Sequence, residues 1–167
     1  MIVTTADFID KWTISIGFGS GKLQEYIDEY EPLILAELLG ADFADEIQTQ
    51  FDTGTLTPEN QALFDKIYFN ANVCGDNRLF VSEGIATMLK DFIYSHYQVG
   101  DLGTPTSEGK IKLKTEGGKL VNDNYTDRFN FYNSGVKTYR AIQKYIEENK
   151  EDYPLYKGIK KATTWLI

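Results

Sequence analysis

The sequence is poor in the residues that most often carry chemistry. Among its 167 residues it has one histidine, His96, and one cysteine, Cys74. A single cysteine excludes an internal disulfide, and one histidine with one cysteine cannot supply the ligands of an ordinary zinc site within one chain. The cysteine usage fits a reducing compartment, and the sequence predicts no metal and no cofactor.

Signatures of catalysis and of nucleotide binding are also lacking. No serine or cysteine nucleophile motif accompanies His96, which lies on an expected core helix. The run from Gly17 to Lys22 lacks two residues that a P-loop needs, a glycine five positions before its Gly-Lys pair and a Ser or Thr after it. Lys22 also stands where the dinucleotide fingerprint has its third glycine. We therefore expect a loop that leads into a helix, and no enzyme.

Paired carboxylates keep one enzymatic alternative open. A glycosidase holds two carboxylates about 5 to 10 Å apart across a cleft, which spacing along the sequence cannot establish. Most acidic pairs here fit ordinary solvated helix faces. Asp123, Asn124 and Asp127 lack the glycine and the final glutamate of an EF-hand, so we interpret them as a helix cap.

Basic residues are scarce in the first third of the chain. Residues 1–52 carry eleven acidic side chains against Lys11 and Lys22, a net charge of −9, which leaves +1 for residues 53–167 within the total of −8. An acidic surface repels polyphosphate, so sequence-specific DNA binding by this part is disfavoured. Such a surface suits a basic partner, or a passage to which DNA must not adhere.

Long apolar runs are absent. No stretch approaches the about 20 apolar residues that a membrane span needs, and the start MIVTTADFIDKW has no basic segment before an apolar run, as a secretory signal would. We expect no membrane partner and assembly in the cytoplasm. The 42% hydrophobic and 14% aromatic content predicts one folded domain, residues 1–167, with a real core.

Helical periodicity organises the chain, most clearly in residues 21–51. Apolar residues recur there at steps of three and four, and Gly40 closes the helix where a left-handed residue is favoured. Pro32 predicts a kink, or else the restart of a second short helix in series. A further helical repeat covers residues 42–51.

Four more helices are expected. A short one near the start is capped by Thr5 and carries Phe8, Ile9 and Trp12. The helices at residues 82–97 and 125–149 have long apolar stripes, the first of which predicts the centre of the core. The remaining helix opens at Thr57-Pro58 and ends at residues 74–77, with an apolar face made of Leu63, Phe64, Ile67 and Tyr68.

Two segments of different character complete the chain. In residues 98–124, rich in glycine, lysines alternate with apolar residues, which predicts a β-hairpin or an extended loop that leans on the helices or on another subunit. The tail, residues 155–167, is basic and then apolar, and either packs on its own domain or inserts into a neighbour. The candidate interface residues are Lys110, Lys112, Lys114, Lys119, Lys157, Lys160, Lys161, Trp165, Leu166 and Ile167.

Several short motifs occur in an order that resembles a known family. They are Leu23-x-x-Tyr26-Ile27-x-x-x-Glu31, Leu38-Leu39-Gly40, Phe43, the central apolar helix, the glycine- and threonine-rich loop, and Tyr145-Ile146-Glu147-Glu148-Asn149 before Tyr153-Pro154. Together they resemble the head-tail connector, or adaptor, proteins of tailed bacteriophages such as the Bacteroides and crAss-like phages. The glycine-rich residues 17–21 depart from that family.

The resemblance implies a mainly α fold, a small helical bundle with a β-hairpin or extended-loop insertion. It also implies a structural virion protein at the head-tail junction, a ring of twelve subunits that joins the portal to the next neck or tail protein. Double-stranded DNA would pass through this ring without specific binding, and the terminal segment would dock on the portal. Two alternatives remain, a carboxylate-dependent cell-wall hydrolase and an acidic regulatory binding module.

Overall fold

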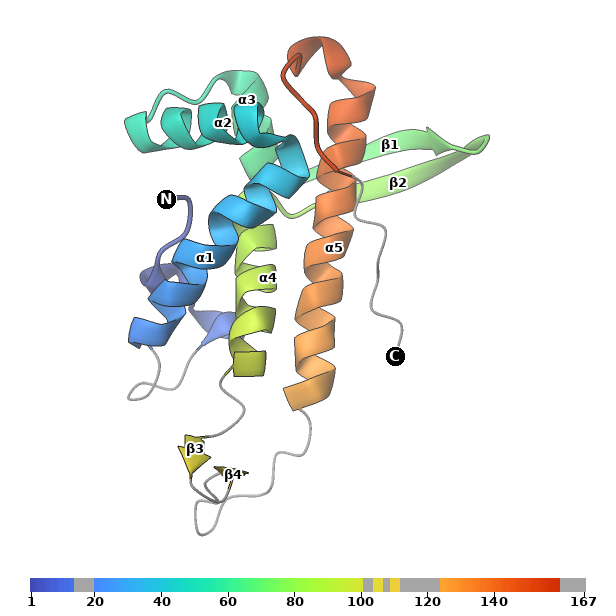
Figure 1. The fold of residues 1–167 in the computed structure, drawn as a ribbon. Helices are drawn as coiled ribbons and strands as arrows, with labels where there is room; N and C mark the ends of the chain where they lie inside the picture. The colour runs from blue at the N-terminus through green and yellow to red at the C-terminus, as the bar shows by residue number, and fades with distance from the viewer. Residues whose placement is uncertain (14–19, 101–103, 107–108, 112–123, 160–167) are drawn as a thin grey trace.

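The computed structural model describes residues 1–13, 20–100, 104–106, 109–111 and 124–159 (Figure 1). It confirms a mainly helical protein with a small β-hairpin. The described helices are α1 (Ser20–Leu39), α2 (Ala41–Thr53), α3 (Pro58–Phe64), α4 (Ile85–Gly100) and α5 (Asn124–Glu148), with 3-10 turns η1 (Thr5–Asp7), η2 (Asp10–Trp12) and η3 (Lys150–Asp152). The strands are β1 (Ile67–Val73), β2 (Asp76–Ser82), β3 (Thr104–Thr106) and β4 (Gly109–Ile111), paired antiparallel as β1-β2 and β3-β4.

The core lies between α1, α4 and α5. Helices α4 and α5 run side by side, α1 packs on α4, and α2 and α3 cover one end, while β1 and β2 pass α5 and project from the body (Figure 1). The expected central stripe of α4 is confirmed, because Ile85, Met88, Leu89, Phe92 and Ile93 have no exposed surface. Within the described residues, no helix is both long and apolar enough to span a bilayer.

Two predicted helix boundaries are confirmed. Gly40 separates α1 from α2 with φ at +89°, a conformation in which a residue without a side chain is favoured. The side-chain oxygen of Thr57 accepts a hydrogen bond from the Asn60 N–H at 3.2 Å, and Pro58 is the first residue of α3. Helix α1 runs through Pro32 as one element, so the alternative of two helices in series is wrong.

The expected continuation of the third helix beyond Phe64 is wrong. Ile67 and Tyr68 begin β1. At the predicted helix end, Cys74 and Gly75 form the turn between β1 and β2, and Asp76 and Asn77 begin β2. Cys74 and Gly75 have φ of +55° and +92°, the two positive values of a type I′ hairpin turn. The strand conformation is favoured over a continued helix because it brings Phe69 onto Phe80, with 5.5 Å between ring centroids. Phe69 also meets the Tyr145 ring of α5 edge-on, at 5.4 Å between centroids.

The N-terminal residues also differ from the expectation. They form η1 and η2 in place of one short α-helix, and the cap is Thr4, not Thr5: the Asp7 carboxylate accepts from the Thr4 N–H at 2.7 Å. Of the three large apolar residues in this segment, Phe8 and Trp12 are buried, whereas Ile9 is 59% exposed. Phe8 and Ile9 lie between the two turns, and Ile9 has an extended backbone, in which neighbouring side chains point to opposite sides.

The arm predicted at residues 98–124 is described in part. Its described strands are β3 and β4, in which Pro105 pairs with Lys110, so this section is an antiparallel pair. Leu113, Leu120 and Val121 of the expected alternation lie outside the described residues. The first residues of the arm still belong to α4, which ends at Gly100.

Candidate interaction surfaces

The β1-β2 hairpin has one face turned to the body and one turned away. Successive side chains of a strand point to opposite faces, so the register places Tyr68 with Val81, and Asn70 with Leu79, on the face opposite to Phe69 and Phe80. Tyr68 is 62% exposed and Leu79 is 66% exposed, while Val81 is half-buried. We call Tyr68, Leu79 and Val81 the outer hairpin patch.

The side chains around the outer hairpin patch are polar, and one of them is charged, because the Lys66 ammonium lies 5.6 Å from the Tyr68 ring centroid. Asn70, Asn72 and Asn77 are exposed on the same face. At the base of the hairpin the same Lys66 ammonium is 2.8 Å from a Glu83 carboxylate oxygen. A large apolar residue beside an exposed tyrosine, rimmed by amides, has the composition of a protein interface.

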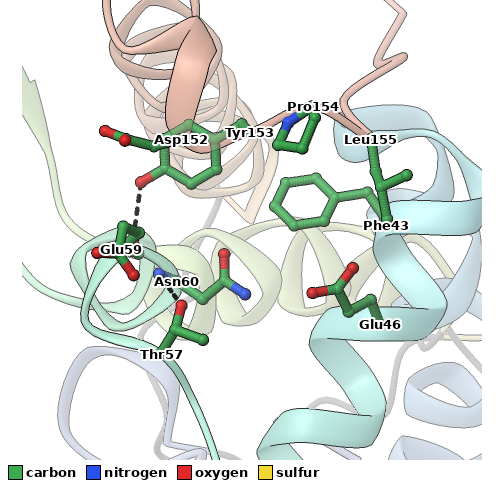
Figure 2. A pocket seen from close by; sticks show the side chains of 9 residues that line it. All are labelled: Phe43, Glu46, Thr57, Glu59, Asn60, Asp152, Tyr153, Pro154 and Leu155. Carbon is green, nitrogen blue, oxygen red and sulfur yellow. Dashed lines mark hydrogen bonds between the residues drawn. The ribbon is translucent and has the colours of Figure 1, made fainter.

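A pocket of about 330 Å³ lies between α2, α3 and the turn after η3 (Figure 2). Its apolar wall is formed by Phe43, Tyr153, Pro154 and Leu155, and the Phe43 and Tyr153 rings are 5.9 Å apart. Tyr153 donates its hydroxyl hydrogen to the Glu59 carbonyl at 2.7 Å. Burial raises the pKa of Tyr153, which keeps this hydroxyl protonated and the wall fixed.

Two consecutive side-chain hydrogen bonds, which we call the amide relay, fix the polar side of the pocket. The Asn60 side-chain N–H₂ donates to the Gln50 side-chain oxygen at 2.8 Å, and the Gln50 N–H₂ donates to a Glu46 carboxylate oxygen at 2.8 Å. Figure 2 shows the Glu46 carboxylate and the Asn60 amide below the two rings. The lining residues include three carboxylates, those of Glu46, Glu59 and Asp152, and no cationic side chain.

Of the candidate interface residues, the structure describes two. Lys110 pairs through the backbone of β4, and the Lys157 ammonium donates to an Asp42 carboxylate oxygen at 3.1 Å. Lys112, Lys114, Lys119, Lys160, Lys161, Trp165, Leu166 and Ile167 lie outside the described residues. The described start of the tail packs on its own domain, because the Lys157 N–H donates to the Leu39 carbonyl and the Ile159 N–H to the Glu37 carbonyl.

The side chains that the sequence offers for catalysis are His96, Cys74 and the acidic pairs. His96 stacks on Tyr30 with 4.3 Å between ring centroids, and Cys74 is exposed in the hairpin turn. Across the described ranges, no three His, Cys, Asp or Glu side chains are grouped so as to hold a metal ion. Among the acidic pairs, Glu147 and Glu148 face Lys144 of the same helix.

Sequence reasoning missed the outer hairpin patch and the pocket. An alternation of apolar and polar residues from Ile67 to Val73 was the available signal for the patch. The pocket had none, because its walls come from segments about a hundred residues apart in the sequence.

Comparisons with known proteins return nothing: no family model, no curated protein and no solved structure matches this chain. The features of the structure that bear on function are therefore its two surfaces, the outer hairpin patch and the pocket. Both are suited to contacts with other polypeptides, one because it projects and the other because it is hollow.

Proposed function

We propose that this chain is a structural virion protein that assembles with identical copies into a ring between the portal of a phage head and the next neck or tail protein. The observation that carries the proposal is the outer hairpin patch. Tyr68 and Leu79 point away from the subunit on an element that projects from it (Figure 1), where a neighbouring copy can cover them.

The hairpin has the geometry of a contact element. A two-stranded sheet is only marginally stable alone, and here its inner face is secured on α5 through Phe69 and Tyr145. The outer face is therefore presented in one fixed conformation before any partner arrives. Such preorganisation lowers the entropy that association costs.

The charge of the helices supports the same proposal. Exposed carboxylates lie along both α1 and α2, at Glu25, Asp28, Glu29, Glu37, Asp42, Asp45 and Asp52. On the wall of a ring, an acidic helix pair repels the DNA backbone and lets a duplex slide through. The number of twelve subunits and the portal as partner come from the resemblance of the sequence motifs to the connector family.

Native mass measurement across a range of protein concentrations, with and without a portal protein, tests this proposal. We expect ring-sized assemblies for the wild type, and a double variant, Tyr68→Ser with Leu79→Ser, to weaken association at least about 30-fold, because central interface tyrosines often contribute 2 kcal/mol or more. Ile9→Ser is the matched control, since Ile9 is similarly exposed but lies away from the hairpin.

Two results would count against the proposal. One is a protein that stays monomeric at every concentration and also in the presence of portal. The other is an assembly that tolerates the double hairpin variant as well as it tolerates Ile9→Ser.

One observation favours a second candidate, the carboxylate-dependent hydrolase. The pocket is concave and carries Glu46, Glu59 and Asp152 on its lining. Cell-wall glycan is the substrate to offer, and Glu46→Gln should abolish turnover without changing the fold if this candidate is correct. Absence of turnover with intact glycan would leave the pocket free for a binding role.

A further inference from the structure

The pocket between α2, α3 and the turn after η3 has the chemistry of a receptor for a basic side chain beside an apolar one. Its wall of Phe43, Tyr153, Pro154 and Leu155 offers apolar and aromatic surface. Glu46, Glu59 and Asp152 bring three carboxylates and no opposing cation among the lining residues. Lysine or arginine can meet a carboxylate and a ring face in the same site.

Glu46 is positioned in advance for such a contact. One of its carboxylate oxygens accepts from the Gln50 amide, whose own oxygen is fixed by Asn60, which is 5% exposed. A carboxylate held by this relay loses little freedom when it meets a cation. In Figure 2 the Glu46 carboxylate lies below the Phe43 ring, on the same side of the pocket.

The chain itself contains a segment of complementary composition. Residues 160–167 have the sequence KKATTWLI, two lysines followed by Trp165-Leu166-Ile167, with no acidic residue. Its positive charge matches the carboxylates and its apolar end matches the pocket wall. We call residues 160–167 the basic tail, and only its sequence enters the inference.

The described residues before the basic tail lead away from the pocket of the same subunit. Leu155 lines the pocket, Lys157 then bonds the carbonyl of Leu39, and Ile159 bonds the carbonyl of Glu37. The chain thus runs backward along α1 and toward the middle of α5, where the Tyr139 hydroxyl donates to the Ile159 carbonyl at 2.7 Å. From there, eight residues can extend about 26 to 29 Å, enough to reach a neighbouring molecule.

We propose that this pocket receives the basic tail of a second copy of the chain. A tail lysine faces Glu46 and the outer carboxylates, and the apolar residues after it lie on Phe43, Pro154 and Leu155. The contact is heterologous, since the pocket and the tail are different surfaces, so each copy can receive one tail and donate another. The inference rests on the proposed function in one respect, that copies meet.

A peptide experiment tests the pocket without any ring. The receptor is the full chain carrying Lys160→Glu and Lys161→Glu, so that its own tail does not compete, and the probe is a fluorescent peptide of residues 158–167. We expect saturable binding that weakens with salt, and a further Glu46→Gln change in the receptor to weaken it about tenfold, the effect of losing a charge-assisted contact. Glu29→Gln, on exposed α1, is the control and should leave binding unchanged.

A mixing experiment tests which copy supplies the tail. The Glu46→Gln protein keeps a normal tail, and the Lys160→Glu, Lys161→Glu protein keeps a normal pocket. We expect each alone to associate more weakly than the wild type, and the mixture to recover one-to-one pairs that contain both variants. The inference is overturned if the mixture does not recover association and the peptide does not bind. It is also overturned if the peptide binds equally well to receptors with and without Glu46→Gln.

The outcomes separate this inference from the ring proposal. If the protein forms rings that respond to the hairpin variant but not to Glu46→Gln or to the tail variant, the ring stands and the tail contact is wrong. If the wild type associates in a way that Glu46→Gln and the tail variant both weaken, but never forms ring-sized assemblies, the tail contact stands and the ring is wrong. Peptide binding without recovery in the mixture assigns the pocket to the tail of the same copy, and overturns the second-copy assignment.

Discussion

The two ends of the described chain are both held on the helices, but by different chemistry. Residues 1–12 are held by carboxylates: Glu31 accepts from the Ile2 and Val3 N–H groups at 2.8 and 3.0 Å, and Asp91 accepts from the Trp12 indole N–H at 2.8 Å. Residues 157–159 are held by backbone carbonyls of α1, at Leu39 and Glu37. One attachment depends on side chains, and the other on the shape of the backbone.

The difference determines what can loosen each end. A side-chain attachment responds to a change of one residue, and both Glu31 and Asp91 are buried, with 3% and 0% exposure. A backbone attachment is indifferent to most side-chain changes, and depends on whether the chain can approach the carbonyls closely. Gly158 is the residue that permits this approach, since an added Cβ would lie 1.9 Å from the Leu38 carbonyl oxygen.

The largest effect is expected for Gly158→Ala. The added methyl group overlaps the Leu38 carbonyl, so the segment must lift from α1 and give up the bonds made by Lys157 and Ile159. We expect the free energy of unfolding to fall by about 3 kcal/mol, as for other overpacked sites. Urea unfolding measures it, with Ile159→Ala as the control, because that exposed side chain can be shortened while its backbone bond remains. Equal stability of the two variants would contradict a backbone attachment.

The next effect concerns Asp91. Its second carboxylate oxygen is buried and has no hydrogen-bond partner among the residues that the structure describes, and its first accepts from Trp12 and, at 3.2 Å, from Lys11. Asp91→Ala leaves the indole N–H of Trp12 buried and unpaired, which should cost about 2 kcal/mol. Asp91→Asn keeps that acceptor and should cost clearly less. Chemical unfolding of both variants measures the difference. If the alanine variant is as stable as the asparagine variant, the Asp91 side chain does not hold the N-terminal residues.

Glu31 gives the comparison a pH dependence. Burial raises the pKa of Glu31 above its ordinary 4.5, although the two backbone N–H groups oppose this. The folded state therefore binds the proton more tightly than the unfolded state. The stabilisation from this group is fully present below pH 4.5 and is lost as the pH rises through the raised pKa.

Glu31→Gln removes that titration. We expect the variant to lack this part of the slope of unfolding free energy against pH, and to lose about 1 kcal/mol at neutral pH, since its amide N–H₂ faces one backbone N–H. Urea midpoints from acid to neutral pH measure both quantities. Identical slopes for the wild type and the variant would show that Glu31 does not titrate in this range.

The smallest effect is expected for Lys157→Ala. Its ammonium pairs with Asp42 at the surface, where water screens the charges and both side chains are well exposed. We expect a change within about 0.5 kcal/mol, which urea unfolding can bound. A loss comparable to that of Gly158→Ala would mean that the C-terminal attachment relies on charge after all.

Two helix boundaries were among the parts of the fold that the sequence could predict. Gly40 and Thr57-Pro58 act through their own backbone preferences, so their positions in the sequence are sufficient. The hairpin was missed for two reasons. Ile67 and Tyr68 continue the helical spacing of Leu63 and Phe64, and the turn has Cys74 where an Asn or Asp before the glycine would have indicated a hairpin.

The hairpin and the pocket depend on contacts between segments that are distant in the sequence, so the sequence alone could not predict them. The strand at Ile67 is stabilised by Phe69 against Tyr145 of α5, and the pocket requires Phe43 beside Tyr153. No local pattern encodes these pairs. The interface roles of Lys157, of the other candidate lysines and of Trp165, Leu166 and Ile167 stay predictions.

The hairpin turn offers a practical consequence. Its Cys74 is the chain's sole thiol, it is exposed, and it lies at the tip of the projecting strands. A nitroxide attached there would place one unpaired electron on each copy without any engineered cysteine. In a closed assembly the set of electron-electron separations depends on the number of copies, so pulsed dipolar spectroscopy would count them.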